Sequence, residues 1–147
     1  MKLFKCATFN VNSIRSRLHT VIPWLDEKRP DVLCMQETKV DNDHFPVDAF
    51  HEIGYSLIFS GNKEGRNGVA LASLIKPDRY TIGFSSEPMD SDRLLVARFP
   101  GITIINTYVP QGYSIDDARF RYKLKWFRRF KEFILADIDL NRNVPAI

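Results

Sequence analysis

The pattern of apolar residues at the start of the chain predicts a strand, a helix and a second strand. Residues 2–10 carry the apolar side chains of a strand, and residues 32–36 form a continuous apolar run, which is expected when both faces of a strand are covered. Between them lies a helical pattern that ends near Lys28. Its apolar face is made by Leu18, Val21, Ile22 and Leu25.

Pro23 falls inside this helical pattern and affects where the helix begins. If Thr20 is the N-cap, Pro23 occupies the third helical position, where its missing N–H has no intrahelical partner in any case. We therefore expect a helix that begins just after Thr20 and ends near Lys28.

Two strands joined by a helix are expected to run parallel and to lie side by side through a right-handed crossover. The carboxyl ends of both predicted strands then share one edge of the sheet, and ligands of open α/β sheets tend to bind beyond that edge. Asn10 ends the first strand, and Glu37 directly follows the second. We expect these two side chains to meet there.

The middle of the chain has a different character, with short apolar segments separated by turn residues. Five segments predict the strands of an antiparallel region: residues 55–60, 69–75, 79–84, 94–99 and 102–109. Polar loops are expected at residues 61–68 and 87–92, and a short helix at residues 45–53.

The last part of the chain predicts one long amphipathic helix, from about residue 116 to residue 137. Spacings of three and four residues align Phe120, Leu124, Phe127, Phe130, Phe133 and Ile134 on one side. Lys and Arg side chains decorate the rest of the helix, which suits a solvated face, with a nucleic-acid-binding stripe as the alternative. Residues 144–147 have the pattern of another strand, at which the sequence ends.

Composition places the chain among ordinary globular domains. It has 147 residues, of which 44% are hydrophobic and 27% charged, and these values argue against the disordered, fibrous and membrane classes. No apolar run approaches the roughly 20 residues that cross a bilayer, and the N-terminus lacks a signal-peptide pattern. The net charge of +3 is too small to indicate a polyanionic partner by itself.

Cysteine usage suggests a reducing compartment. Cys6 and Cys34 both lie in apolar strand patterns, and no CxxC or histidine spacing surrounds them. We therefore expect two reduced core thiols instead of a disulfide or a metal site. Together with the missing signal-peptide pattern, this predicts an intracellular protein, located in the cytoplasm or, in a eukaryote, in the nucleus.

Three polar clusters each end an apolar strand, at residues 10–12, 36–39 and 107–112. Singly they are weak evidence, because Asn often forms turns, Glu is usually solvated and Tyr often packs in strands. Five longer blocks contain them: FNVNSIR at 9–15, PDVLCMQETK at 30–39, GVALAS at 68–73, RLLVARF at 93–99 and INTYVPQG at 105–112. In order and approximate spacing, these blocks resemble the exodeoxyribonuclease III family of abasic-site (AP) endonucleases, within the endonuclease/exonuclease/phosphatase superfamily.

This resemblance implies a deoxyribonuclease I-like fold, an α/β sandwich in which two packed mixed sheets are flanked by helices. It covers nearly the whole chain but corresponds to roughly the first half of the family's sequence. We therefore expect residues 1–147 to form a single, incomplete endonuclease/exonuclease/phosphatase domain, with apolar surface exposed where the second sheet would pack. That surface offers a route to a homodimer.

The resemblance also implies roles for individual residues. Glu37 matches the family's magnesium-binding glutamate, and Asn10 matches the asparagine that helps to arrange the metal and the catalytic groups. The implied cofactor is Mg²⁺, with Mn²⁺ as an alternative. Tyr108 matches the tyrosine whose phenol contacts the scissile phosphate. The DNA-facing edge corresponds to Asn12, Arg15, Lys39, Arg93 and Gln111.

The implied activity is magnesium-dependent hydrolysis of phosphodiesters in double-stranded DNA, at abasic sites and at 3′ ends. The family takes its catalytic base from a Gly-Asp-x-Asn motif and a later Ser-Asp-His motif, and neither occurs in this sequence. His19, His44 and His51 match no family motif and suit ordinary surface positions. We therefore expect this chain to be inactive by itself.

Two alternatives remain open. Phosphoinositide phosphatases, sphingomyelinases and deadenylases of the same superfamily share the Asn and Glu clusters, although the INTYVPQG block argues against them. A non-catalytic DNA-binding or interaction module would use the basic helix and the polar strand ends. It predicts salt-sensitive DNA affinity that does not need magnesium.

Overall fold

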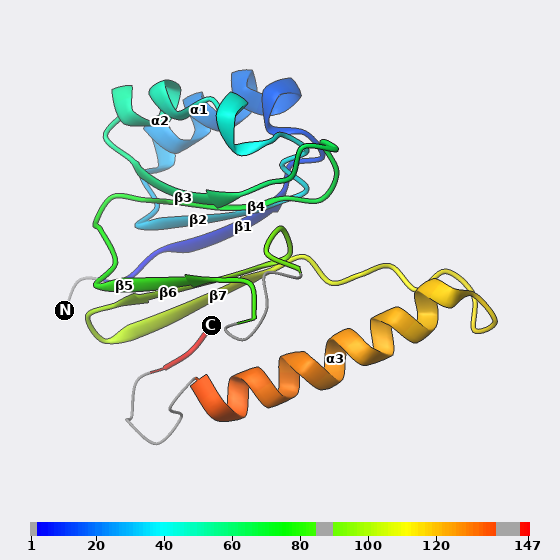
Figure 1. The fold of residues 1–147 in the computed structure, drawn as a ribbon. Coiled ribbons are helices and arrows are strands. Elements are labelled where there is room, and N and C mark those ends of the chain that lie inside the picture. Colours follow the sequence, from blue (N-terminus) through cyan, green and yellow to red (C-terminus); the bar gives the residue numbers. More distant parts are fainter. Residues whose placement is uncertain (1–2, 85–89, 138–144) are drawn as a thin grey trace.

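The computed structural model describes residues 3–84, 90–137 and 145–147. Two β-sheets stack on each other, with helices on both outer faces (Figure 1). α1 (Ile14–Lys28) and α2 (Val47–Glu52) cover the first sheet, and α3 (Ala118–Asp137) lies against the second. A short 3₁₀ turn, Asn42–His44, precedes α2. The predicted α/β sandwich with two sheets and flanking helices is confirmed. The prediction of apolar surface left exposed where a second sheet would pack is wrong for the described residues, because the second sheet is present and shares a buried core with the first.

The first sheet has the order β1-β2-β4-β3, made by β1 (Cys6–Asn10), β2 (Val32–Gln36), β4 (Val69–Ser73) and β3 (Ser56–Ser60). β1 and β2 are parallel, whereas β4 runs antiparallel to both of its neighbours. The predicted parallel pair is therefore confirmed. In the part of the chain that the structure describes, β1 is an edge strand, and most of its residues are exposed.

The second sheet is antiparallel, in the order β5 (Arg79–Ile82), β6 (Leu94–Phe99) and β7 (Ile102–Thr107). All five strands predicted in the middle of the chain are thus present within their expected limits. The strand pattern at the C-terminal end corresponds to a single parallel bridge between Thr103 and Ala146. Residues 2, 87–89 and 144 of the predicted segments lie outside the described residues.

The side chains of β2 show how the layers pack. Leu33 and Met35 belong to the core beneath α1 and α2, and Val32 and Cys34 to the core between the sheets. The continuous apolar run in the sequence follows from this position, because a strand in the middle of the sandwich has no face in water. Fully burying such a side chain contributes about 1.5–3 kcal/mol.

α3 packs on the second sheet through an aromatic cluster. Trp126 and Phe133 are buried, and the centre of the Phe84 ring lies 5.8 Å from the centre of each of their rings. Leu124 and Phe127, which the sequence pattern placed on the apolar face, are each 43% exposed in the described structure. None of the described helices, α3 included, combines the length and the apolar content needed to cross a membrane.

α1 begins at Ile14, so the prediction of an N-cap at Thr20 is wrong. Pro23 therefore lies inside the helix, where its missing N–H removes one intrahelical hydrogen bond. The helix begins early because its start is tied to a neighbouring strand end: Ile14 N–H donates to the carbonyl oxygen of Thr38 at 3.0 Å, and the Ile14 side chain is fully buried. Such long-range contacts outweigh the local cost of the proline.

The two cysteines are free thiols, as expected, but only one is in the core. Cys34 is buried in β2, whereas Cys6 is exposed on β1, so the core position predicted for Cys6 is wrong. The reason is topological. An apolar strand pattern does not reveal whether the strand lies at the edge or in the middle of its sheet.

Candidate functional site

Asn10 and Glu37 meet at the carboxyl ends of β1 and β2. Asn10 is opposite Gln36 in the parallel register, so Glu37 is the first residue beyond the pair. Asn10 Nδ2 donates a 2.7 Å hydrogen bond to Glu37 Oε1, and Asn10 Oδ1 accepts from Asn12 N–H at 3.1 Å. The predicted proximity of the amide and the carboxylate is confirmed.

The backbone around Glu37 is shaped by a loop that precedes β4. Thr38 N–H donates to the carbonyl oxygen of Gly68 at 3.2 Å, and Lys39 N–H donates to that of Asn67 at 2.9 Å. Gly68 has a φ of +91°, and a Cβ at this position would collide with Thr38 Oγ1. Only glycine permits this approach, which holds the segment after β2 in a fixed turn.

The Glu37 carboxylate is surrounded by donors. Besides Asn10, it is contacted by Lys39, whose Nζ lies 3.1 Å from Oε2, and by the Tyr108 hydroxyl, which donates a hydrogen bond to it. Burial alone would raise the pKa of Glu37, but the hydrogen bonds from these three side chains outweigh it and leave the pKa below its usual range. The carboxylate is therefore ionised at neutral pH.

Tyr108 follows β7 and brings a phenol from the second sheet to the same edge. Burial raises the pKa of Tyr108, and the negative charge of Glu37 raises it further. The phenol therefore stays protonated and remains a hydrogen-bond donor. Arg93 lies against the ring, with its guanidinium carbon 4.9 Å from the ring centre. The three polar strand ends singled out in the sequence thus converge.

The remaining residues of the predicted DNA-facing edge lie in different places. Lys39 joins the cluster and also donates to Asn12 Oδ1. Gln111 is exposed on the loop between β7 and α3. Arg15 is exposed on α1 and lines a shallow hollow with Ala49 of α2 and other residues, so the structure does not bring it into the Glu37 cluster.

Three residues of this region were missed in the sequence. Asn67 binds the turn after Glu37, and Asn106 is buried in β7, where its Nδ2 donates to the carbonyl oxygens of Met35 at 3.1 Å and Ala70 at 2.8 Å. The third, Tyr113, is 67% exposed and raises the pKa of Tyr108, so it lies near the cluster. The sequence did contain a signal for Asn106, because a polar Asn inside an otherwise apolar strand segment indicates a buried side chain with hydrogen-bond partners.

Arg119 holds the exposed ring of Tyr113. Its guanidinium carbon lies 3.3 Å from the ring centre, and its Nε donates to Asp117 Oδ1 at 2.9 Å. Tyr113 also has a φ of +55°, a conformation that non-glycine residues adopt only when their surroundings impose it. Local contacts thus organise the segment that leads into α3.

The strand edge around Glu37 carries oxygen atoms of the kind that bind hard metal ions. Among the described residues, no group of three or more His, Cys, Asp and Glu side chains is arranged to hold a metal. Glu37 and Asn10 supply hard oxygen atoms, and Mg²⁺ characteristically binds through one or two carboxylates while waters and phosphate oxygens complete its coordination. These two residues therefore fit part of the coordination shell of such an ion.

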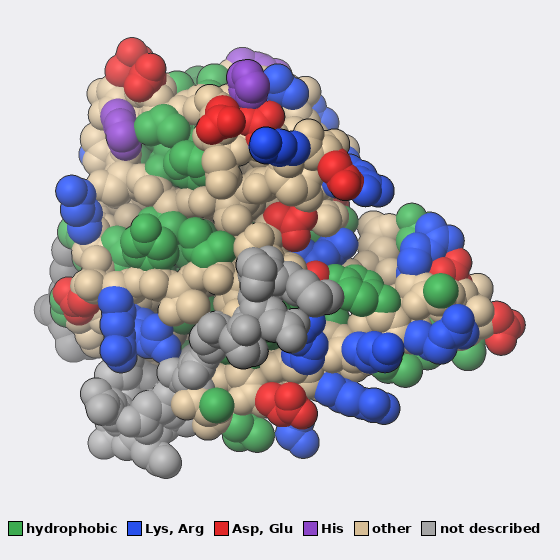
Figure 2. Space-filling view, in the orientation of Figure 1, with side chains coloured by type: hydrophobic (Ala, Val, Ile, Leu, Met, Phe, Trp, Pro, Cys, Tyr) green, Lys and Arg blue, Asp and Glu red, His purple; other side chains and the backbone are tan. Residues whose placement is uncertain are grey.

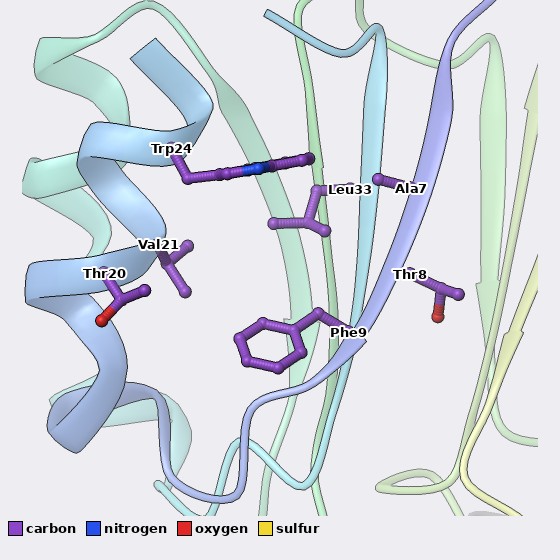
Figure 3. A pocket seen from close by; sticks show the side chains of 7 residues that line it. All are labelled: Ala7, Thr8, Phe9, Thr20, Val21, Trp24 and Leu33. Atoms are coloured by element: carbon purple, nitrogen blue, oxygen red, sulfur yellow. The ribbon is translucent and has the colours of Figure 1, made fainter. Parts of the chain in front are cut away.

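A separate apolar hollow of about 310 Å³ lies between β1 and α1 (Figure 3). Phe9 and Leu33 point into it from the strands and Trp24 from the helix, whereas Thr8 points to the opposite face of β1. None of its seven lining residues is ionisable. It therefore offers apolar surface and no group for acid, base or metal chemistry.

Comparison with known proteins agrees with this site. Residues 7–147 match the Endonuclease/Exonuclease/phosphatase family, and the chain belongs to this family. The expected resemblance to exodeoxyribonuclease III and AP endonucleases is confirmed. The chain is 30% identical, over 141 residues, to exodeoxyribonuclease III of Haemophilus influenzae, covering 92% of this chain and 52% of that protein.

Solved structures confirm the fold. An AP endonuclease from Archaeoglobus fulgidus is 57% identical and superposes with a TM-score of 0.88 over 93% of this chain and 53% of its own. The 3′ phosphatase NExo from Neisseria, bound to a product DNA hairpin, is 35% identical with a TM-score of 0.87, over 94% of this chain and 54% of its own. The chain thus spans about half the length of these relatives.

Proposed function

We propose that the protein acts in DNA repair as a magnesium-dependent phosphodiesterase of the exodeoxyribonuclease III type. Its substrates would be double-stranded DNA with abasic sites and DNA 3′ ends. The observation that carries this proposal is the convergence of Asn10, Glu37 and Tyr108 at one edge of the sandwich. Relatives named as an AP endonuclease and as a 3′ phosphatase bound to DNA support the substrate class.

In this proposal, each residue of the cluster has a chemical task. Glu37 and Asn10 hold the divalent cation, which would be Mg²⁺ or Mn²⁺ and would polarise the phosphate oxygens when bound. Tyr108 keeps its proton and donates it in a hydrogen bond to a phosphate oxygen, where negative charge develops during hydrolysis. Lys39 and Asn12 lie beside Glu37 and contribute to binding the DNA backbone.

We further propose that residues 1–147 form an incomplete domain of this family and that this chain does not cleave DNA by itself. Attack by water needs a base, and the Gly-Asp-x-Asn and Ser-Asp-His motifs that supply one in the family are absent from the sequence. The histidines do not replace them in this proposal, since His19 lies in α1, His44 in the short 3₁₀ turn and His51 in α2, and Tyr108 follows β7 of the second sheet.

DNA is the proposed partner, and the surface charge supports it. Lys and Arg side chains gather along α3 (Figure 2). The basic residues of this helix are Arg119, Arg121, Lys123, Lys125, Arg128, Arg129 and Lys131. Their positive charge also favours a second candidate function, a DNA-binding module without catalysis. A repair role would place the protein in the cytoplasm, or in the nucleus of a eukaryote.

The experiment that tests the proposal combines binding and cleavage. The chain is mixed with fluorescent duplex DNA that holds one abasic site, and anisotropy is followed with and without MgCl₂. We expect magnesium to strengthen binding in the wild type and not in Glu37→Gln, with no cleavage in either. Binding that ignores both magnesium and this substitution would support the DNA-binding module instead.

Two further arms complete this test. Cleavage by the 147-residue chain, at the rate of a full-length relative, would contradict the proposed need for the absent motifs. An inositol phospholipid headgroup serves as the competing ligand. If it displaces magnesium-dependent DNA binding at low concentration, another phosphatase of the superfamily becomes the better assignment.

We also propose that two copies associate through the exposed edge of β1. In the described structure Phe9 is 42% exposed and Trp24 is 38% exposed, and both line the apolar hollow. The unpaired backbone groups of an edge strand can also form hydrogen bonds with a strand of another copy. Sedimentation equilibrium tests this. Phe9→Lys should weaken the dimer, whereas Leu135→Lys, a control on α3 that is 68% exposed, should not. A wild-type chain that stays monomeric at high concentration would contradict the proposal.

A further inference from the structure

Arg93 directly precedes β6, and it holds both the ring and the backbone of Tyr108. The guanidinium carbon lies 4.9 Å from the ring centre, and Nη1 donates to the Tyr108 carbonyl oxygen at 3.2 Å. In return, the Arg93 carbonyl oxygen accepts from Tyr108 N–H at 2.8 Å and from the Thr107 hydroxyl at 3.1 Å. These contacts fix Tyr108 at the point where β7 ends.

The other terminal nitrogen of Arg93 reaches toward the first sheet. Nη2 donates to Asn67 Oδ1 at 3.1 Å. The Asn67 carbonyl oxygen accepts from Lys39 N–H at 2.9 Å, in the turn that follows Glu37. A continuous chain of contacts therefore links the strand end that carries Tyr108 to the strand end that carries Glu37.

We propose that Arg93 is a positioning residue, which sets the place of Tyr108 relative to Glu37 by clamping the end of β7 to the loop of residues 61–68. The positioning is a property of the folded chain. Only its consequence for phosphate chemistry rests on the proposed function.

The burial of Arg93 separates this role from direct binding of DNA phosphates. Its side chain is 14% exposed, its Nε lies 3.9 Å from Asp90 Oδ1, and its terminal nitrogens are engaged by Tyr108 and Asn67. An arginine that contacts phosphates presents its forked donors to the ligand. Lysine would keep the charge but lacks the planar fork that reaches both partners at once.

The proposal is tested by NMR of the 147-residue chain with ¹³C-labelled tyrosine rings, which gives signals from five tyrosines. We expect Arg93→Gln to move the Tyr108 ring signals toward those of a freely rotating, exposed tyrosine. In Arg93→Lys, the Tyr108 ring signals should likewise stay away from their wild-type positions. Asn67→Gly, which suits the φ of +55° at this position, should give a smaller shift in the same direction. Arg79→Gln, on an exposed position of β5, is the control without effect.

The Tyr108 signals show whether Arg93 positions this tyrosine. Tyr108 signals that stay in place in Arg93→Gln, or that are fully restored by lysine, overturn the proposal. If Arg93→Gln unfolds and all tyrosine signals collapse together, Asn67→Gly decides: a selective Tyr108 shift supports the clamp, and no shift overturns it. Failure of the proposed function appears separately, as a wild-type spectrum in which MgCl₂ leaves the ring signals of Tyr108, which donates a hydrogen bond to Glu37, unchanged.

Discussion

Asn10 Nδ2 and Glu37 Oε1 are 2.7 Å apart, although 26 residues lie between these two positions in the sequence. Asn10 ends β1, and Glu37 directly follows β2. The contact exists because β1 and β2 are parallel neighbours and end at the same edge. A helix between two parallel strands returns the chain to its starting edge, so both side chains emerge on one side of the sheet. The site is therefore a direct consequence of topology.

The first prediction concerns the metal affinity of Glu37. Glu37→Gln keeps the shape of the side chain but removes its negative charge, so we expect Mn²⁺ or Mg²⁺ to bind about tenfold more weakly or worse. Calorimetric titration measures the change. Glu64→Gln is the matched control, because this carboxylate is 65% exposed in the neighbouring loop. Equal metal affinities of the two variants would show that Glu37 is not a metal ligand.

The second prediction concerns the close approach of Gly68 to Thr38. Gly68→Ala places a Cβ against Thr38 Oγ1 and forces a positive φ on alanine. It should therefore lower the free energy of unfolding by more than the roughly 1–3 kcal/mol expected from the backbone strain alone. Gly101→Ala is the control, since its φ is +79° but its added Cβ meets nothing within 4 Å. Urea denaturation of both variants checks the difference. Equal losses would show that the contact has no energetic importance.

The third prediction concerns the buried amide of Asn106, which joins the two sheets. Asn106 is 2% exposed, and its Nδ2 serves two backbone carbonyl oxygens of the first sheet. Asn106→Ala leaves these acceptors without that donor and should cost about 1–3 kcal/mol. Asn106→Asp should cost more, because a buried carboxylate would face two oxygen atoms. Thermal denaturation ranks the variants, and an aspartate variant as stable as the wild type would contradict the prediction.

Local patterns were sufficient to predict the strands, the parallel pair and the meeting of Asn10 with Glu37. The central strand β2 was recognisable because its burial on both faces leaves a continuous apolar run. The helix start was not, because Ile14 is held by the distant carbonyl of Thr38. The exposure of Cys6 was also hidden, since it depends on which strands lie beside β1.

In the candidate site too, local sequence patterns revealed some residues, whereas residues that depend on long-range contacts were missed. Tyr108 was found only through the resemblance to a family, because a tyrosine after a strand has no distinctive local pattern. Asn67 was missed since its importance comes from contacts with Arg93 and Lys39, which the loop sequence does not reveal. Residues that supply chemistry were thus easier to find than residues that position them.

The fourth prediction follows from the position of Pro23 inside α1. Pro23→Ala restores an N–H that can donate to the carbonyl oxygen of His19, and it removes the clash of the proline ring with that group. We expect the free energy of unfolding to rise by about 1–3 kcal/mol, measured by urea denaturation. A loss of stability would mean that the proline shapes the helix for its packing on the sheet.

The fifth prediction concerns pH and Asp117, which precedes α3. Its Oδ1 accepts from Arg119 N–H at 2.8 Å, and hydrogen bonds from the Arg119 side chain and backbone lower its pKa to about 2. Because the pKa in the folded state is below the 3.8 of an aspartate in an unfolded chain, the contribution of Asp117 is fully present above pH 3.8 and is lost as the pH falls toward 2. Asp117→Asn should therefore flatten the pH dependence of stability between pH 4 and pH 2. Denaturation of both proteins across this range tests it, and parallel curves would show that Asp117 does not stabilise the start of the helix.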